Sequence, residues 1–279
     1  MQLPVIRPMT RADIDPVVAL LLSQDWGDRR LYLEFALAHP ETQPFVAEAD
    51  GVAVGTGVIS LNGTVGWIGT IFVDPAWRRR GVGLELTRTT IDVADAAACR
   101  TLVLVATAAG RPLYEQVGFE VQTWYRILEA PGLASATRID PRIRAFEPHD
   151  LDAMEALDAA VTGEDRAHLI GTFADRGTAR VLVASDGVLG GFVVRAPWGG
   201  GATIAPALDD AEAILHARRV AHGPDGHVRA GVLSENEAGL ERLLANGWVE
   251  MWRAPRLIRG DPLTWQPDAI WGQFNHALG

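Results

Sequence analysis

Residues 66–97, GWIGTIFVDPAWRRRGVGLELTRTTIDVADAA, decide how the rest of the chain is organised. Residues 66–73 are apolar and rich in β-branched side chains, which predicts a buried strand. The Asp74-Pro75 pair ends this strand, because proline has no N–H group to donate to a sheet. The stretch therefore predicts a strand, a cationic turn and an amphipathic helix that continues to about Ala97.

The turn combines three features that favour anion binding. Arg78, Arg79 and Arg80 supply positive charge. Gly81 and Gly83 let the backbone approach a ligand closely with its N–H groups bare, and the helix that follows adds the positive end of its dipole. This combination predicts that the turn binds a diphosphate group.

The spacing of the glycines excludes two common phosphate motifs. A dinucleotide fingerprint needs a third glycine at the position of Leu86, and a P-loop needs a lysine, of which the chain has none. The pattern that remains, Arg78-x-x-Gly81-x-Gly83, resembles the loop with which GCN5-related N-acetyltransferases (GNAT) cradle the pyrophosphate of acetyl-coenzyme A.

A second signature lies further along the chain. Residues 101–106 predict another buried strand, and residues 110–119, GRPLYEQVGF, place Tyr114 four residues before Gly118-Phe119. This pattern is similar to a GNAT signature in which the tyrosine is the general acid that protonates the thiolate of departing coenzyme A. The two signatures occur in the order of the family, across a strand-helix-strand unit. The alternative is that Tyr114 packs as an ordinary helix residue and the three arginines form a solvated turn.

The resemblance implies an α+β fold with a mixed sheet, and an enzyme that uses acetyl-coenzyme A as its cosubstrate. In that fold two strands splay apart at the centre of the sheet, and the thioester runs between them with strand backbone groups along the pantetheine arm. The residues that the resemblance assigns to acetyl-coenzyme A are Ile71, Phe72, Val73, Arg78, Arg79, Arg80, Gly81, Val82, Gly83 and Leu84.

The N-terminal half reads β-α-α-β-β-β-α-β-α before a closing strand. Strands are predicted at about 5–8, 45–49, 52–60, 66–73, 101–106 and 120–128, and helices at about 10–23, 29–38, 82–97 and 110–116. In GNAT enzymes the segment between the first two helices commonly overhangs the acceptor site, which makes Trp26 and Asp28 candidates for substrate contact. Thr70 is a third candidate, because it is the one polar side chain of strand 66–73. A lone surface tryptophan is the alternative for Trp26.

The second half of the chain repeats the first. Ile143-Arg144 follows Ile6-Arg7 after 137 residues, and Gly247-Trp248 follows Gly118-Phe119 after 129 residues. An ordered set of matches with a slowly shrinking offset indicates a duplicated fold. We therefore predict two tandem GNAT-fold domains, with a catalytic domain over 1–130, a linker over 131–140 and a degenerate copy over 141–279.

The second copy lacks the residues that carry the chemistry of the first. Asp209, Asp210 and Glu212 stand where the first copy has arginines and glycines, and these acids would repel a pyrophosphate. Leu243 stands where the first copy has Tyr114. We expect that the second copy binds no acetyl-coenzyme A and instead supports or covers the site of the first. The whole chain resembles tandem bacterial acetyltransferases whose second half is likewise degenerate.

Composition limits which classes of binding partner and which cellular compartment are expected. The chain has 279 residues and a formal net charge of −10, which argues against nucleic acid and is consistent with a cationic amine substrate. Cys99 is the only cysteine, so no intramolecular disulfide can form, and a core residue in a cytoplasmic protein is expected. The apolar run at residues 17–22 is far too short for a membrane span, and acidic residues precede it, so neither membrane association nor a signal peptide is expected.

Two further groups of residues lie outside the GNAT signatures. His216, His222 and His227 have spacings that match no common set of ligands, so no metal site is expected. Trp265, Trp271 and Phe274 form an apolar tail, which we expect to dock between the two domains or against a partner chain.

These observations predict an acetyl-coenzyme A-dependent N-acetyltransferase that acts on a primary amine of a small molecule, as a monomer or homodimer. The amine would attack the thioester directly, and Tyr114 would protonate the leaving sulfur. Strand 66–73 has no Asp, Glu or His to serve as general base, which leaves Asp28, Glu48, a residue of the second domain or water. Two other functions stay open, a non-enzymatic acyl-coenzyme A sensor and a protein N-acetyltransferase.

Overall fold

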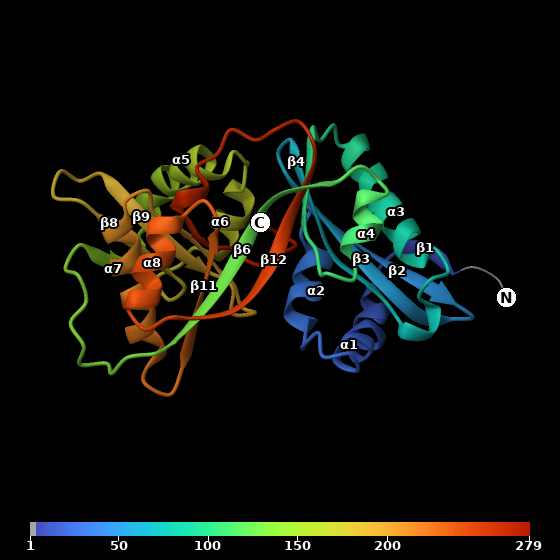
Figure 1. The fold of residues 1–279 in the computed structure, drawn as a ribbon, viewed down its shortest axis with the longest axis horizontal. Helices are drawn as coiled ribbons and strands as arrows, with labels where there is room; N and C mark the ends of the chain where they lie inside the picture. The colour runs from blue at the N-terminus through green and yellow to red at the C-terminus, as the bar shows by residue number, and fades with distance from the viewer. Residues whose placement is uncertain (1–3) are drawn as a thin grey trace. The chain divides into compact units, whose positions relative to one another are not determined.

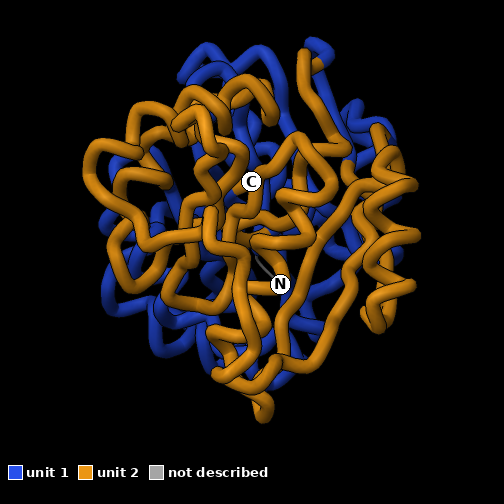
Figure 2. Tube along the Cα trace, turned by 90° about the vertical axis from the view of Figure 1, so that its left-hand side faces the viewer, with its two compact units in different colours: residues 1–121, 257–262, 276–278 blue, residues 122–256, 263–275, 279 orange. Residues whose placement is uncertain are grey.

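The computed structural model describes residues 4–279, and these divide into two compact units. Unit 1 holds the described residues up to Val121 together with Leu257–Pro262 and His276–Leu278. Unit 2 holds Gln122–Arg256, Leu263–Asn275 and Gly279, and Figure 2 shows the two units in different colours. The C-terminal part of the chain therefore supplies residues to both units, and the domain boundaries 1–130 and 141–279 stay a prediction.

Unit 1 is built on a mixed sheet. Its strands are β1 (Val5–Pro8), β2 (Thr42–Ala49), β3 (Val52–Asn62), β4 (Val65–Val73) and β5 (Thr101–Val105), in the order β1-β2-β3-β4-β5, with the end of β12 (Val249–Gly260) next to β5. Neighbours from β1 to β4 run antiparallel, whereas β4 and β5 run parallel. The predicted α+β class with a mixed sheet is thereby confirmed.

Helices cover both faces of this sheet (Figure 1). They are η1 (Arg11–Asp13), α1 (Ile14–Leu22), α2 (Arg30–Ala38), η2 (Pro75–Trp77), α3 (Val82–Ala96) and α4 (Arg111–Glu115). Alternate residues of β2, Phe45 and Ala47, pack in one core with Leu86 and Ile91 of α3. Because successive side chains of a strand point to opposite faces, the other face is left for α1 and α2, which contact β3 and β2.

Unit 2 contains a second sheet of order β13-β10-β9-β8-β7, in which every pair is antiparallel. Its strands are β7 (Ile143–Ala145), β8 (Ala179–Val183), β9 (Leu189–Arg195), β10 (Gly201–Ile204) and β13 (Ile270–Gly272). The helices of the unit are η3 (Pro148–Asp150), α5 (Leu151–Thr162), α6 (Ala167–Phe173), α7 (Leu208–His222), α8 (Glu237–Ala245) and η4 (Pro267–Ala269).

Two long strands also enter unit 2. Residues 125–131 of β6 (Glu120–Pro131) pair antiparallel with β11 (His227–Leu233), and β12 lies on the other side of β6. The closing strand predicted at 120–128 therefore continues to Pro131. It does so because Ala130, which is buried, pairs with Val228 of β11. The local sequence gave no sign of this distant partner.

The duplication is visible in single hydrogen bonds. The two guanidinium nitrogens of Arg7 donate to the two carboxylate oxygens of Asp13, both at 2.8 Å. Arg144 binds Asp150 in the same way, at 2.7 and 2.6 Å. In each copy an arginine of the first strand thus holds the aspartate of the 3-10 turn that opens the first helix. The duplicated fold predicted from the offset of 137 residues is consistent with this finding.

The C-terminal aromatic residues do not form a detached tail. Trp271 lies in β13, is buried in the core of unit 2, and donates from its indole N–H to the Ala205 carbonyl at 3.0 Å. Phe274 is fully buried and packs on Phe173, with ring centroids 5.4 Å apart. The prediction that Trp271 docks between domains or on a partner was wrong, because Trp271 lies in β13, which pairs with β10 and completes the sheet of unit 2.

His276–Leu278 belong to unit 1 again. The side-chain amide of Asn62 donates to the Leu278 carbonyl at 2.9 Å, and a Cβ atom on Gly69 would lie only 2.1 Å from the Cβ of Ala277. Gly69 is therefore required for the C-terminal residues to rest on β4. Within residues 4–279, every helix is too short or too polar to cross a membrane.

Candidate functional site

The cationic turn has the backbone that a bound anion would need. Asp74 Oδ1 accepts a hydrogen bond from the Ala76 N–H at 2.7 Å, which ends β4 and starts the 3-10 turn. Arg79 and Gly81 both have left-handed backbones, with φ of 62° and 85°. Gly81 has open space around its Cβ position, so the backbone conformation and not crowding favours glycine there. This geometry directs the chain into α3 at Val82 with the first N–H groups of the helix unsatisfied by side-chain caps.

The three arginines of the turn are exposed. Arg78 donates from Nε to the Val73 carbonyl at 2.9 Å, and its guanidinium carbon lies 5.8 Å from the centre of the Phe72 ring. Arg80 lies over Trp77 at 5.1 Å. Among the described residues, neither Arg78 nor Arg79 forms an ion pair with an acid, so their charge is available to a ligand.

Gly83 brings the turn close to α4. A Cβ atom on Gly83 would lie 3.1 Å from Leu113 of α4 and 3.6 Å from Val73 of β4. A larger residue would therefore separate the start of α3 from the helix that carries Tyr114. Close packing against α4 therefore gives a second reason for glycine at position 83, besides the ligand approach that the sequence predicts.

Strands β4 and β5 part beyond their first residues. Their parallel pairing is limited to Val65–Trp67 with Thr101–Val103. On the other edge of β4, the register with β3 shifts between Thr56 and Val58, so Thr70 and Ile71 form a bulge, and Thr70 has a φ of 53°. The edge of β4 over 70–73 is therefore not paired with β5, which leaves backbone groups there for an extended ligand.

Tyr114 lies on α4 and is largely buried. Its ring packs edge-on against Phe119, with centroids 6.2 Å apart and an angle of 69°. Burial raises the pKa of its hydroxyl well above the ordinary value of a tyrosine. The group therefore stays protonated at neutral pH and can donate a proton, as a general acid must.

Two of the three acceptor-site candidates meet at β4. Trp26, between α1 and α2, packs edge-on against Phe72 with ring centroids 5.2 Å apart. Thr70 is itself a residue of β4. Asp28 is exposed and accepts a hydrogen bond from the Arg30 N–H at 2.8 Å, which places it at the start of α2 and not on β4.

Three residues that the sequence did not single out lie at the same place. Arg29 donates from Nε to the Trp26 carbonyl at 3.0 Å and has no acidic partner in the described part of the chain. The positive charge of Arg29 is close enough to lower the pKa of both the Tyr32 hydroxyl and the His276 imidazole. The backbone of His276 lies beside Gly69. Burial lowers the pKa of His276 to about 4, so its imidazole is neutral at pH 7. No local pattern marks these residues, because His276 reaches β4 from the far end of the chain.

Glu48, the other candidate for the general base in unit 1, is already paired with an arginine. Glu48 on β2 accepts from Arg7 at 2.9 and 2.5 Å.

Between residues 4 and 279 there is no group of three or more His, Cys, Asp or Glu side chains placed to hold a metal ion. Cys99 is half-buried, and burial raises the pKa of its thiol, which disfavours the reactive thiolate.

The corresponding turn of unit 2 is chemically different. Asp210 pairs with Arg142 at 2.8 Å, and Arg242 pairs with Asp209 and Glu212 at 3.1 and 2.5 Å. Leu243, at the position of Tyr114, is buried in the core of the unit. The start of α7 is therefore occupied by ion pairs instead of free cations.

Comparison with known proteins gives a family match for part of unit 1. Residues 14–119 match the model of the family described as the acetyltransferase (GNAT) family. No curated protein matches the chain.

Solved structures match over both units. A protein of Pyrococcus horikoshii described as an acetyltransferase is 23% identical, with a TM-score of 0.85 over 100% of this chain and 97% of its own. A GCN5-related N-acetyltransferase of Sphaerobacter thermophilus is 18% identical, with a TM-score of 0.66 over 95% of this chain and 100% of its own. A tandem GNAT protein from the clavulanic acid biosynthesis pathway is 15% identical, with a TM-score of 0.66 over 92% and 99%. At these identities the matches establish the fold, including its tandem form.

Proposed function

We propose that this chain, whose residues 14–119 match the GNAT family model, transfers the acetyl group of acetyl-coenzyme A to a primary amine of a small molecule. The observation that carries the proposal is the sequence of three features along one sheet. These are an exposed cationic turn at a helix start, a strand edge left open by β5, and a buried, protonated tyrosine on α4.

The donor would lie along β4 and the turn. Its pyrophosphate would bind the N–H groups at the start of α3 and the guanidinium groups beside them. Its pantetheine arm would pair with the open edge of β4. The residues proposed to contact it are Ile71, Phe72, Val73, Arg78, Arg79, Arg80, Gly81, Val82, Gly83 and Leu84.

The reaction follows from these positions. The amine nitrogen attacks the thioester carbon, and backbone N–H groups near Phe72 and Val73 stabilise the oxygen of the tetrahedral intermediate. The C–S bond then breaks, and the hydroxyl of Tyr114 gives its proton to the departing sulfur. We assign the proton of the amine to water, because β4 carries no carboxylate and Glu48 is bound to Arg7.

Arg29 narrows the class of acceptor. It is a cation without an acidic partner among residues 4–279, and it lies beside Trp26 and Tyr32, next to the open part of β4. Such a group favours an acceptor that carries a carboxylate or phosphate near its amine. The net negative charge of the chain alone would favour a purely cationic substrate. We give the charge of Arg29 more weight, because it would contact the acceptor directly, whereas charges far from the site are screened by salt.

The test is release of free thiol from acetyl-coenzyme A in the presence of a panel of amines. The panel should contain neutral amines, amino acids and short peptides with free N-termini. Thiol release with small amines supports the proposal, and release only with peptides would instead make the protein a protein N-acetyltransferase. Coenzyme A binding without thiol release from any amine would identify an acyl-coenzyme A sensor.

The compartment and assembly are part of the proposal. A single half-buried cysteine supports a cytoplasmic location. A monomer or a homodimer is proposed, and sedimentation of the purified chain measures which of the two is present.

A further inference from the structure

Unit 2 contains a buried guanidinium group that forms no ion pair with any of the described residues. Arg218, on α7, is only 7% exposed, and its Nε atom has no hydrogen-bond partner. The Nε atom of Arg195, at the end of β9, is likewise buried and without a partner. Throughout the described chain, no carboxylate forms an ion pair with either arginine.

The fold of unit 2 places both arginines on the same face of its sheet. Arg195 is opposite Gly201, and Val193 is opposite Thr203, so Arg195 and Thr203 project to the face that carries Val193. Val193 packs in one core with α7. The face that Arg195 and Thr203 share is therefore the face that α7 covers.

The helix brings two further groups to this face. Arg218 and His222 are four residues apart on α7, which puts them on one side of the helix. Arg218 donates from one terminal nitrogen to Thr203 Oγ1 at 3.3 Å. Burial, together with the charge of Arg195, lowers the pKa of Arg218 to about 10. Burial also lowers the pKa of His222, with contributions from both arginines, so the three basic groups are close together.

The other buried arginines of unit 2 show how this chain normally compensates such a charge. Arg166 is 2% exposed and donates to both oxygens of Asp158, at 2.9 and 2.5 Å. Arg256 is 1% exposed and lies 3.7 Å from Glu164. Burial of a charge is costly unless a partner offsets it. Arg218 is the exception among these three arginines, because the charge that acts on it, that of Arg195, has the same sign.

The dipole of α7 does not compensate the charge of Arg218. Helix C-termini favour cations, but the effect is confined to the last turn. That turn holds Arg219 and His222, whereas Arg218 lies before it. An additional negative group is therefore required to offset the charges of Arg195 and Arg218.

We propose that Arg195, Arg218 and His222 bind a phosphate-type oxyanion, with Thr203 as a neutral partner. Two guanidinium groups supply several directed N–H donors, which suit a small ion with several oxygens and more than one negative charge. The source is either inorganic phosphate or the phosphate group of a metabolite. The site lies in the copy without a coenzyme A cradle, and it gives that copy a ligand of its own.

The test measures the thermal stability of the full chain as inorganic phosphate replaces KCl at constant ionic strength. A ligand that binds only the folded state raises Tm. Phosphate should raise the Tm of the wild type, and Arg218→Met should increase the phosphate concentration needed for half of the shift by about tenfold or more. In phosphate-free buffer, Arg218→Met should have a higher Tm than the wild type, because it removes an uncompensated buried charge.

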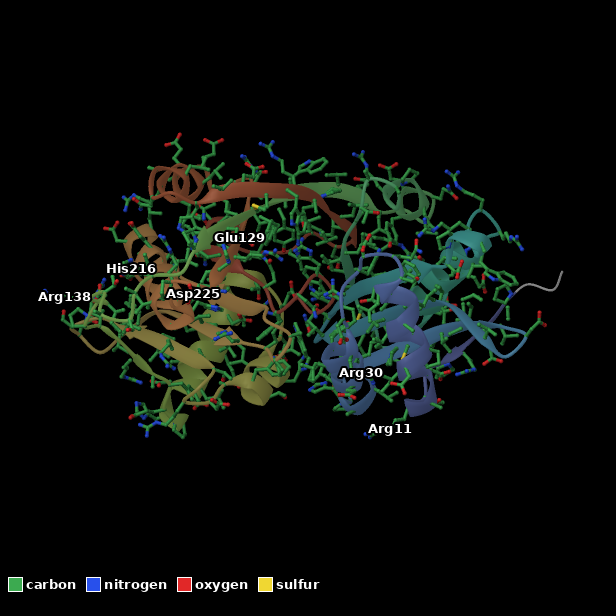
Figure 3. The ribbon with its side chains drawn as sticks, turned by 90° about the horizontal axis from the view of Figure 1, so that it is seen from below. Arg11, Arg30, Glu129, Arg138, His216 and Asp225 are labelled. Atoms are coloured by element: carbon green, nitrogen blue, oxygen red, sulfur yellow. The ribbon has the colours of Figure 1, made fainter. Side chains whose placement is uncertain are left out.

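Two controls separate this site from other cations. Arg78→Ala alters the cationic turn of unit 1. Phosphate should still raise the Tm of this variant, because the proposed phosphate site lies in unit 2. Arg138→Met removes an exposed arginine of unit 2, labelled in Figure 3, and should respond to phosphate as the wild type does. Neither readout depends on acetyl transfer, so the anion site and the proposed enzyme activity can fail independently.

Several outcomes would overturn the proposal. They are an unchanged Tm of the wild type in phosphate, an equal shift in Arg218→Met, and a shift that Arg78→Ala abolishes. If Arg218→Met does not fold, Arg195→Met provides the same comparison from a less buried position. A parallel titration with glycerol 3-phosphate identifies the source, since tighter binding of the ester indicates a metabolite and tighter binding of the inorganic ion indicates free phosphate.

Discussion

The ring of Tyr114 packs edge-on against Phe119, with centroids 6.2 Å apart. This contact fixes the ring through its carbon atoms and leaves the hydroxyl for chemistry. Tyr114→Phe should therefore keep the packing and Tm of the protein, and lower turnover by about 10²-fold, within the range of general acid catalysis. Thiol release under saturating acetyl-coenzyme A and amine measures the effect. Unchanged turnover would show that Tyr114 is only a packing residue.

Arg78 should contribute to the affinity for coenzyme A. Its guanidinium is held at the end of β4 by the Val73 carbonyl, in the turn that leads into α3, so Arg78→Ala should raise the Kd of coenzyme A by about tenfold through loss of a charge-assisted contact. Calorimetric titration measures the change. Arg88→Ala, on the exposed side of α3, is the matched control and should leave the Kd as it is. Equal affinities of the two variants would contradict the position assigned to the pyrophosphate.

Arg29 should distinguish acceptors by charge. Arg29→Met should raise the KM of amines that carry a carboxylate by about tenfold, and should leave the KM of neutral amines of similar size unchanged. The neighbouring Arg30→Met is the control, because Arg30 on α2 (Figure 3) already pairs with Asp15 at 2.6 Å. A uniform loss with both classes of amine would instead indicate a purely structural role for Arg29.

The ion pair of Arg7 and Asp13 should make folding sensitive to acid. Hydrogen bonds from Arg7 hold the pKa of Asp13 well below its ordinary value, so the ionised carboxylate stabilises the fold above about pH 4, and this contribution disappears as the pH falls below that value. Asp13→Asn should lower the free energy of unfolding at pH 7 by about 1–3 kcal/mol and flatten its dependence on pH between about 5 and 2. Urea denaturation across this range measures both effects. Asp15→Asn, at an exposed pair, should change stability by less than about 0.5 kcal/mol.

Gly69 should be required for docking of the C-terminal residues on β4. Gly69→Ala places a Cβ atom 2.1 Å from that of Ala277, and should reduce the free energy of unfolding by about 1–3 kcal/mol. Gly171→Ala, inside α6 with no close neighbour at the Cβ position, should instead stabilise the protein by about 0.5–1 kcal/mol. Similar effects at both positions in urea denaturation would contradict the contact between β4 and the C-terminal residues.

The sequence predicted the features that are encoded within short segments. The Arg-Gly turn, the start of α3 and the short helix of Tyr114 each depend on a few neighbouring residues and on local backbone preferences. The duplication was visible because an arginine and an aspartate recur with the same spacing, and their ion pairs recur in the structure. The mixed sheet followed from the order of these segments.

The predictions that failed or were missing concern residues brought together from distant segments. Trp271 and Phe274 read as an apolar tail because nothing in their own segment shows that β13 pairs with β10. The cluster of Arg29, Tyr32 and His276 has the same origin, since its members come from a loop, a helix and the end of the chain.

The sequence by itself determined the family signatures, the class of fold and the loss of those signatures in the second copy, because each is written in local spacing. Only the tertiary structure decided that β4 and β5 part after three paired residues, that Arg29 has no acidic partner among residues 4–279, and that Arg195 and Arg218 share one buried face. The physical reason is that strand pairing and charge compensation depend on which distant groups meet, and a sequence pattern does not specify those meetings.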